Sequence, residues 1–97
     1  MDDSQGQIRV YATDWCADCI VARRVLDGFD VAYDWVDITD NDEAIEFVRA
    51  QNRGYRSVPT IVLPDGNTLT EPSGRALTAA LLALGYSPKA PAAQAIR

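Results

Sequence analysis

Apolar residues follow two kinds of spacing along this chain. Apolar and polar residues alternate over 7–12 and 32–38, which predicts strands, because successive side chains on a strand point to opposite faces. Over 16–27, from about 42 to 52, and over 73–84, apolar residues recur at three- and four-residue spacing. This second spacing predicts three amphipathic helices.

Two further strands are predicted at 60–63 and 68–70, on either side of Pro64-Asp65-Gly66-Asn67. This tetrapeptide is a strong turn signal, so the two strands should form an antiparallel hairpin. The predicted order is β-α-β-α-β-β-α. Its first two strands should be parallel, because a helix connects them.

Polar residues and glycines mark the expected helix ends. Thr39 or Asp40 should cap the second helix and Ser73 the third, because an oxygen there accepts a hydrogen bond from a free N–H of the first turn. Gly28 and Gly85 should end the first and third helices.

The two cysteines, Cys16 and Cys19, stand where the first strand gives way to the first helix. A sulfur at a helix N-terminus lies at the positive end of the helix dipole, which favours a thiolate, the reactive form of cysteine. We therefore interpret Cys16 as a nucleophile. Cys19, one turn later, is expected to lie buried and to act as the resolving thiol that closes a disulfide onto Cys16.

Two structural interpretations of the cysteines compete with this redox interpretation. A structural zinc site needs about four ligands, and the chain has two cysteines and no histidine, so no metal is expected within one chain. An inert disulfide would close too short a loop to restrict the unfolded chain much. Redox chemistry is the preferred interpretation.

Composition and charge limit which kinds of partner and which cellular compartment are expected. The 97 residues suffice for one compact domain, and a formal net charge of −5 argues against a nucleic-acid partner. The longest mostly apolar stretch, 76–84, is too short to cross a membrane, and the acidic N-terminus is unlike a signal peptide. We expect a monomeric cytoplasmic protein. The cytoplasm keeps thiols reduced, so paired cysteines there are more often catalytic than structural. Its expected parts are a disordered segment over 1–7, the domain over 8–85 and a frayed tail over 86–97.

Three motifs in this order resemble the glutaredoxin-like proteins, and most closely their mycoredoxin branch in actinobacteria. The motifs are Trp15-Cys16-x-x-Cys19, Arg56-Ser57-Val58-Pro59-Thr60 and Asp65-Gly66-Asn67-Thr68-Leu69-Thr70-x-Pro72-Ser73. The resemblance implies a thioredoxin-like, glutaredoxin-type fold: three α/β/α layers around a four-stranded mixed sheet. It also implies that Pro59 is cis and lies against the dithiol, and that the backbone of Val58 pairs with the substrate as an added strand.

Other residues near these motifs are candidates for substrate binding. Trp15 is either an exposed surface for the substrate or a packed core residue. Arg56 either binds the polar groups of a low-molecular-weight thiol, the kind of co-substrate that the resemblance implies, or is a solvated charge. Ser73, at the start of the last helix, is a third candidate. The sequence departs from the family pattern at Asp18, which stands before the second cysteine where these proteins commonly have an aromatic residue, and Asp14 lies just upstream. The charges of these two acids oppose a nearby thiolate. Glu71-Pro72-Ser73 replaces the usual Gly-Gly of glutathione-binding members.

The resemblance implies a thiol-disulfide oxidoreductase that reduces mixed disulfides between proteins and a low-molecular-weight thiol, either mycothiol, which we prefer, or glutathione. No tightly bound cofactor is expected. Because the chain has no Gly-rich dinucleotide motif, electrons should come from NADPH through a separate reductase. Two alternatives remain open: an electron donor of the thioredoxin or ribonucleotide-reductase type, reduced directly by a flavoprotein, and an iron–sulfur cluster carrier that uses Cys16 in a dimer.

Overall fold

The structure, a computed structural model, describes residues 7–89. Within this range it contains β1 (Ile8–Ala12), α1 (Ala17–Asp27), β2 (Tyr33–Asp37), α2 (Asp42–Gln51), β3 (Thr60–Val62), β4 (Thr68–Thr70) and α3 (Gly74–Ala83). The predicted order β-α-β-α-β-β-α is thereby confirmed.

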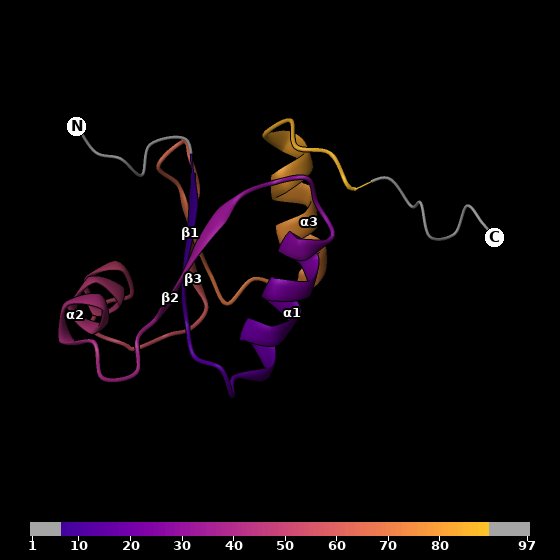
Figure 1. Cartoon of the computed structure of the whole chain (residues 1–97). Coiled ribbons are helices and arrows are strands. Elements are labelled where there is room, and N and C mark those ends of the chain that lie inside the picture. The colour runs from indigo at the N-terminus through magenta and orange to yellow at the C-terminus, as the bar shows by residue number, and fades with distance from the viewer. Residues whose placement is uncertain (1–6, 90–97) are drawn as a thin grey trace.

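The strands form one mixed sheet in the order β2-β1-β3-β4. β1 is parallel to β2 and antiparallel to β3, and β4 is antiparallel to β3. Figure 1 shows α1 and α3 on one side of the sheet and α2 on the other. This three-layer arrangement confirms the expected thioredoxin-like, glutaredoxin-type fold.

Alternating side chains of β1 build a core on each face of the sheet. Ile8, Val10 and Ala12 are fully buried in the cluster that also contains residues of α1 and α3. Tyr11 points to the other face, where it packs in a smaller cluster with Ile38 and residues of α2. Burial of one such large apolar side chain is worth about 1.5–3 kcal/mol, so β1 fixes both helical layers in place.

The helix caps were predicted correctly for α3 and wrongly for α2. The Ser73 hydroxyl accepts a hydrogen bond from the Ala76 N–H at 3.0 Å, as expected. At α2 the cap is Asn41, whose side-chain oxygen accepts from the Ala44 N–H at 3.0 Å. Asp40 has a φ of 59°, outside the extended region that a cap requires, and Thr39 lies in the preceding turn.

The chain beyond α3 folds back onto the end of α1. Gly85 has a φ of 95°, a left-handed conformation that glycine adopts without steric cost, and it ends α3 as expected. The Asp30 N–H then donates to Ser87 O at 2.8 Å, and the Lys89 N–H donates to Gly28 O at 2.8 Å. The segment expected to be disordered was 1–7 and the expected tail was 86–97. Residues 1–6 and 90–97 lie outside the described residues.

None of the helices in residues 7–89 has the length and apolar composition needed to span a bilayer.

Candidate active site

Cys16 occupies the N-cap of α1, as its place between strand and helix predicts. Its backbone is extended, with φ −83° and ψ 123°, and its Sγ accepts a hydrogen bond from the Cys19 N–H at 3.2 Å. This N–H is one of those that a helix leaves unpaired in its first turn. A hydrogen bond to sulfur and the positive end of the helix dipole both favour negative charge on Cys16.

The two thiols lie in different surroundings. Both are free cysteines; Cys16 is half-buried, whereas Cys19 is fully buried. Burial, followed by the hydrogen bond to the Cys16 side chain, raises the pKa of Cys19 to about 12. Cys19 is therefore a neutral thiol at physiological pH, so Cys16 is the thiol suited to attack an incoming disulfide.

Thr13 is a buried residue of the site that the sequence did not single out. Its hydroxyl oxygen has no hydrogen-bond partner among the described residues. Its backbone and side chain nevertheless lower the pKa of Cys19 and so oppose part of the effect of burial. Thr13 lies outside the Cys-x-x-Cys motif, so only its buried position in the fold indicates that it affects Cys19.

The loop that contains Val58 and Pro59 reaches the dithiol from a distant part of the chain. The Val58–Pro59 peptide bond is cis, as the resemblance implies, and Pro59 is buried. The Cys16 thiol donates a hydrogen bond to Val58 O, with 3.7 Å between sulfur and oxygen. Within residues 7–89 no hydrogen bond involves the Val58 N–H.

Exposed side chains lie beside the dithiol in the sequence and in the loop that precedes Val58. Trp15 is 72% exposed, which excludes its interpretation as a core residue. Tyr55 is 70% exposed, and Arg56 next to it is exposed as well. Asp14 and Asp18 are both exposed, so water and salt screen their charges and limit their opposition to a Cys16 thiolate.

Ser73 and Arg23 have structural partners of their own. The Ser73 hydroxyl is engaged in capping α3, and nothing in the contacts of residues 7–89 joins it to Cys16. Its neighbour Gly74 does pack against α1, because a Cβ on Gly74 would lie 3.3 Å from Val21 Cγ1. The Arg23 guanidinium lies 3.9 Å from the centre of the Trp35 ring, in a cation–π contact.

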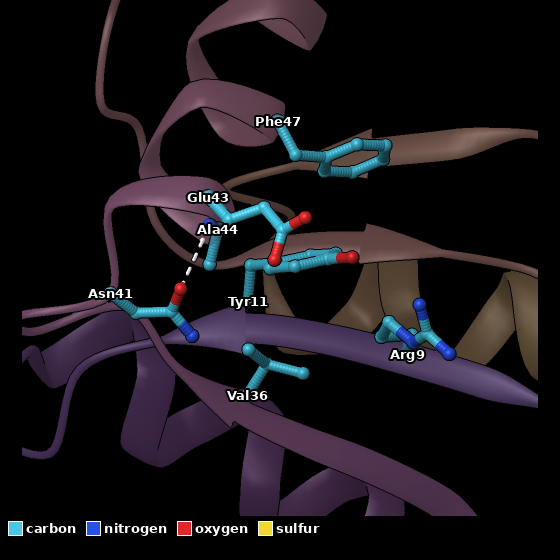
Figure 2. Close-up of a pocket in the computed structure, with 7 residues that line it drawn as sticks. All are labelled: Arg9, Tyr11, Val36, Asn41, Glu43, Ala44 and Phe47. Atoms are coloured by element: carbon cyan, nitrogen blue, oxygen red, sulfur yellow. Dashed lines mark hydrogen bonds between the residues drawn. The ribbon is translucent and has the colours of Figure 1, made fainter.

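A pocket of about 380 Å³ lies on the α2 face of the sheet, away from the dithiol. Figure 2 shows the Tyr11 and Phe47 rings in this pocket, and their centroids are 4.7 Å apart. Asn41, which caps α2, lines the pocket with Arg9 and Glu43. Since neither cysteine lines it, this pocket is separate from the redox site.

The fold and the dithiol define a thioredoxin-like protein with a cysteine pair at Cys-x-x-Cys spacing, and comparisons with known proteins give the family. The glutaredoxin family model matches residues 8–67. The chain is 43% identical over 75 residues to "Putative glutaredoxin Rv3198A" of Mycobacterium tuberculosis, an overlap of 77% of this chain and 89% of that protein. It is 39% identical over 79 residues to "Mycoredoxin 1" of Corynebacterium glutamicum, an overlap of 81% of this chain and 98% of that protein.

The chain therefore belongs to the glutaredoxin family, on its mycoredoxin branch, and is a thiol-disulfide oxidoreductase.

Proposed function

We propose that this protein reduces mixed disulfides between mycothiol and protein cysteines, with Cys16 as nucleophile and Cys19 as resolving thiol. The observation that supports these roles is the contrast between the two sulfurs. Cys16 is half-buried at a helix N-terminus and accepts a backbone hydrogen bond at 3.2 Å. Cys19 is fully buried and has a pKa of about 12, so it cannot compete as the attacking thiolate.

The proposed cycle consists of thiol-disulfide exchanges. The Cys16 thiolate attacks the mycothiol sulfur of the mixed disulfide, and the substrate protein leaves with its cysteine reduced. A second mycothiol then attacks the mycothiol sulfur on Cys16, which regenerates Cys16 and releases mycothiol disulfide. A separate NADPH-dependent reductase returns that disulfide to two thiols. Cys19 offers a second way out of the adduct, by attacking Cys16 and releasing the bound thiol.

Mycothiol is preferred over glutathione on two grounds. The similarity to a protein named "Mycoredoxin 1" covers 81% of this chain. In addition, Glu71-Pro72-Ser73 stands where glutathione-binding members have Gly-Gly. The free Val58 N–H, the exposed Arg56 guanidinium and the N-terminal turn of α3 at Ser73 are the groups proposed to hold the polar parts of the thiol. The exposed Trp15 ring is proposed as an apolar contact for the substrate protein.

The experiment that tests this function combines cysteine variants with a panel of electron sources. Wild type, Cys16→Ser and Cys19→Ser are assayed on a protein that carries a mycothiol mixed disulfide. NADPH is supplied with mycothiol and its reductase, with glutathione and its reductase, or with thioredoxin reductase alone. We expect turnover with mycothiol for wild type and Cys19→Ser and none for Cys16→Ser, because the small thiol itself can release Cys16.

Other outcomes of this panel reject the proposal. A Cys19→Ser variant that is inactive with both small thiols would show that release requires Cys19, as in a thioredoxin-like electron donor. Wild-type turnover with thioredoxin reductase alone would lead to the same conclusion. Faster turnover with glutathione than with mycothiol would keep the roles of the cysteines and reject the choice of thiol.

A further inference from the structure

We infer that Asn52 is a positioning residue for substrate binding, and that it acts by holding the Val58–Pro59 loop against Cys16. Asn52 follows the last residue of α2 and is half-buried. The inference rests on the proposed function, because it takes Cys16 as the attacking thiol and the Val58 backbone as the surface that binds the group whose sulfur Cys16 attacks, which is a peptide in the test below.

The Asn52 side chain connects α2 with β3 and β4. Its Nδ2 donates to Val48 O at 2.7 Å and to Thr60 Oγ1 at 3.0 Å. Its Oδ1 accepts from Thr70 Oγ1 at 2.7 Å. The orientation of the amide is fixed by chemistry, because only the nitrogen can face the Val48 carbonyl. Both ends of the amide are thereby hydrogen-bonded.

Thr60 carries this connection to the residue before Val58. Its hydroxyl is fully buried, accepts from Asn52 and donates to Ser57 O at 2.8 Å. A hydroxyl that donates and accepts at once is polarised by both bonds, which strengthens the chain of hydrogen bonds. Ser57 is therefore held through Thr60, and the next carbonyl, that of Val58, is the one 3.7 Å from Cys16 Sγ.

A second set of bonds anchors the other side of the loop. The Glu71 N–H donates to Pro59 O at 2.8 Å, directly after Thr70, whose hydroxyl binds Asn52. The Tyr55 N–H donates to the backbone carbonyl of Asn52 at 3.0 Å, which fixes the start of the loop. Asn52 is thus bonded to segments on both sides of Val58. Removing its side chain should loosen the Val58 backbone while leaving Cys16 at its helix N-terminus.

The test compares a disulfide that has a peptide backbone with one that has none. The first is a peptide whose cysteine carries thionitrobenzoate, and the second is the symmetrical aromatic disulfide of thionitrobenzoate. In a Cys19→Ser background the Cys16 thiolate attacks the peptide sulfur, a Cys16–peptide disulfide forms, and coloured thionitrobenzoate leaves with the electron pair. The rate against peptide concentration gives the half-saturating concentration and the limiting rate.

We expect Asn52→Ala to raise the half-saturating peptide concentration about tenfold, the effect of losing roughly one good hydrogen bond. The limiting rate and the rate with the aromatic disulfide should stay within about twofold of the parent, because Cys16 keeps the hydrogen bond that it accepts from the Cys19 N–H. Thr60→Val, which is close in shape and lacks the hydroxyl, should reproduce the shift. Thr60→Ser, which keeps the hydroxyl, should restore parental binding.

Asn41→Ala is the matched control. This substitution also removes an asparagine side chain that is hydrogen-bonded to the backbone of α2, here at the N-terminal end of the helix. The Asn41 side chain takes no part in the hydrogen bonds around Val58. The half-saturating concentration of Asn41→Ala should equal that of the parent. A denaturant titration of each variant confirms that the assay is run on folded protein.

Three results would overturn the inference. The first is an unshifted half-saturating concentration in both Asn52→Ala and Thr60→Val. The second is an equal loss of rate with both disulfides, which indicates general damage to the fold. The third is the same shift in Asn41→Ala. If Cys16 of the Cys19→Ser parent reacts with neither disulfide, the proposed role of Cys16 as nucleophile and this inference both fail, whereas a normal parent with unshifted variants rejects the inference alone.

Discussion

Cys16 and Cys19 have the same chemistry and opposite surroundings. Cys16 lies half-buried at the N-terminus of α1, and its Sγ accepts a hydrogen bond from the Cys19 N–H at 3.2 Å. Cys19 points into the apolar cluster under the helix. Burial is the main reason that the pKa of Cys19 reaches about 12, and Cys16 adds to the rise. In an adduct Cys16 no longer carries a thiol, so its contribution disappears while burial remains. Cys19 should still be mostly protonated in the adduct.

The pH dependence of resolution follows from this pKa. Thionitrobenzoate loaded on Cys16 is released when the Cys19 thiolate attacks Cys16. Since a group with a raised pKa is mostly protonated below it, the thiolate fraction and the release rate should rise about tenfold per pH unit over roughly pH 6 to 9, without a plateau. The rate is followed by absorbance of the released thiol.

Release by an added small thiol in Cys19→Ser serves as the comparison. That rate should level off near the ordinary pKa of the added thiol, about 8.5 for a cysteine-like group. A plateau below pH 8 for the intramolecular release would show that Cys19 ionises easily in the adduct, contrary to the effect of burial.

α1 and α3 pack closely because the first residue of α3 is a glycine. A Cβ on Gly74 would lie 3.3 Å from Val21 Cγ1 and 3.6 Å from Val25 Cγ2. The first distance is tighter than an ordinary contact, so a larger side chain must push the helices apart or force Val21 to move. The dithiol stands at the start of α1, and this packing helps to fix that helix against the sheet.

We expect Gly74→Val to lower the free energy of unfolding by about 1–3 kcal/mol through overpacking at Val21. Adding Val21→Ala removes the Cγ atoms that clash, so the double variant should recover part of this loss. Urea titrations of the two single variants and the double variant measure the coupling. Strictly additive losses would show that Gly74 and Val21 do not share this space.

Across the whole molecule, residues 86–89 hold the end of α1 that lies away from the dithiol. Asp30 and Lys89 provide N–H donors for two backbone bonds of 2.8 Å, and Phe29 pairs with Pro88 between them. These bonds join the C-terminal part of the described chain to the turn that leads into β2. They contribute to the stability of the domain and stand apart from the contacts of Cys16.

A comparison of two shortened chains tests this contribution. A chain that ends at Tyr86 should unfold about 1–3 kcal/mol more easily than one that ends at Lys89, because it lacks both bonds. Denaturant midpoints measure the difference. The rate of Cys16 with the aromatic disulfide should be the same in both chains, and a loss of that rate would show that residues 87–89 also support the site.

Local sequence patterns determined the order of the elements, the place of Cys16 at a strand–helix junction and the cap at Ser73, because these depend on residues within a few positions of one another. The α2 cap was missed for a local reason: Thr39, Asp40 and Asn41 are three consecutive cap formers, and only the backbone angles distinguish them. The motif resemblance supplied the loop at Pro59.

The tertiary structure alone decided what surrounds those residues. The depth at which Cys19 is buried depends on how α1, α3 and the sheet pack, and the contact from Cys16 to Val58 joins residues 42 positions apart. The bonds of Asn52 to Thr60 and Thr70 likewise cross from a helix end to two strands. Such contacts leave no spacing in the sequence, because they arise only when separate elements meet in space.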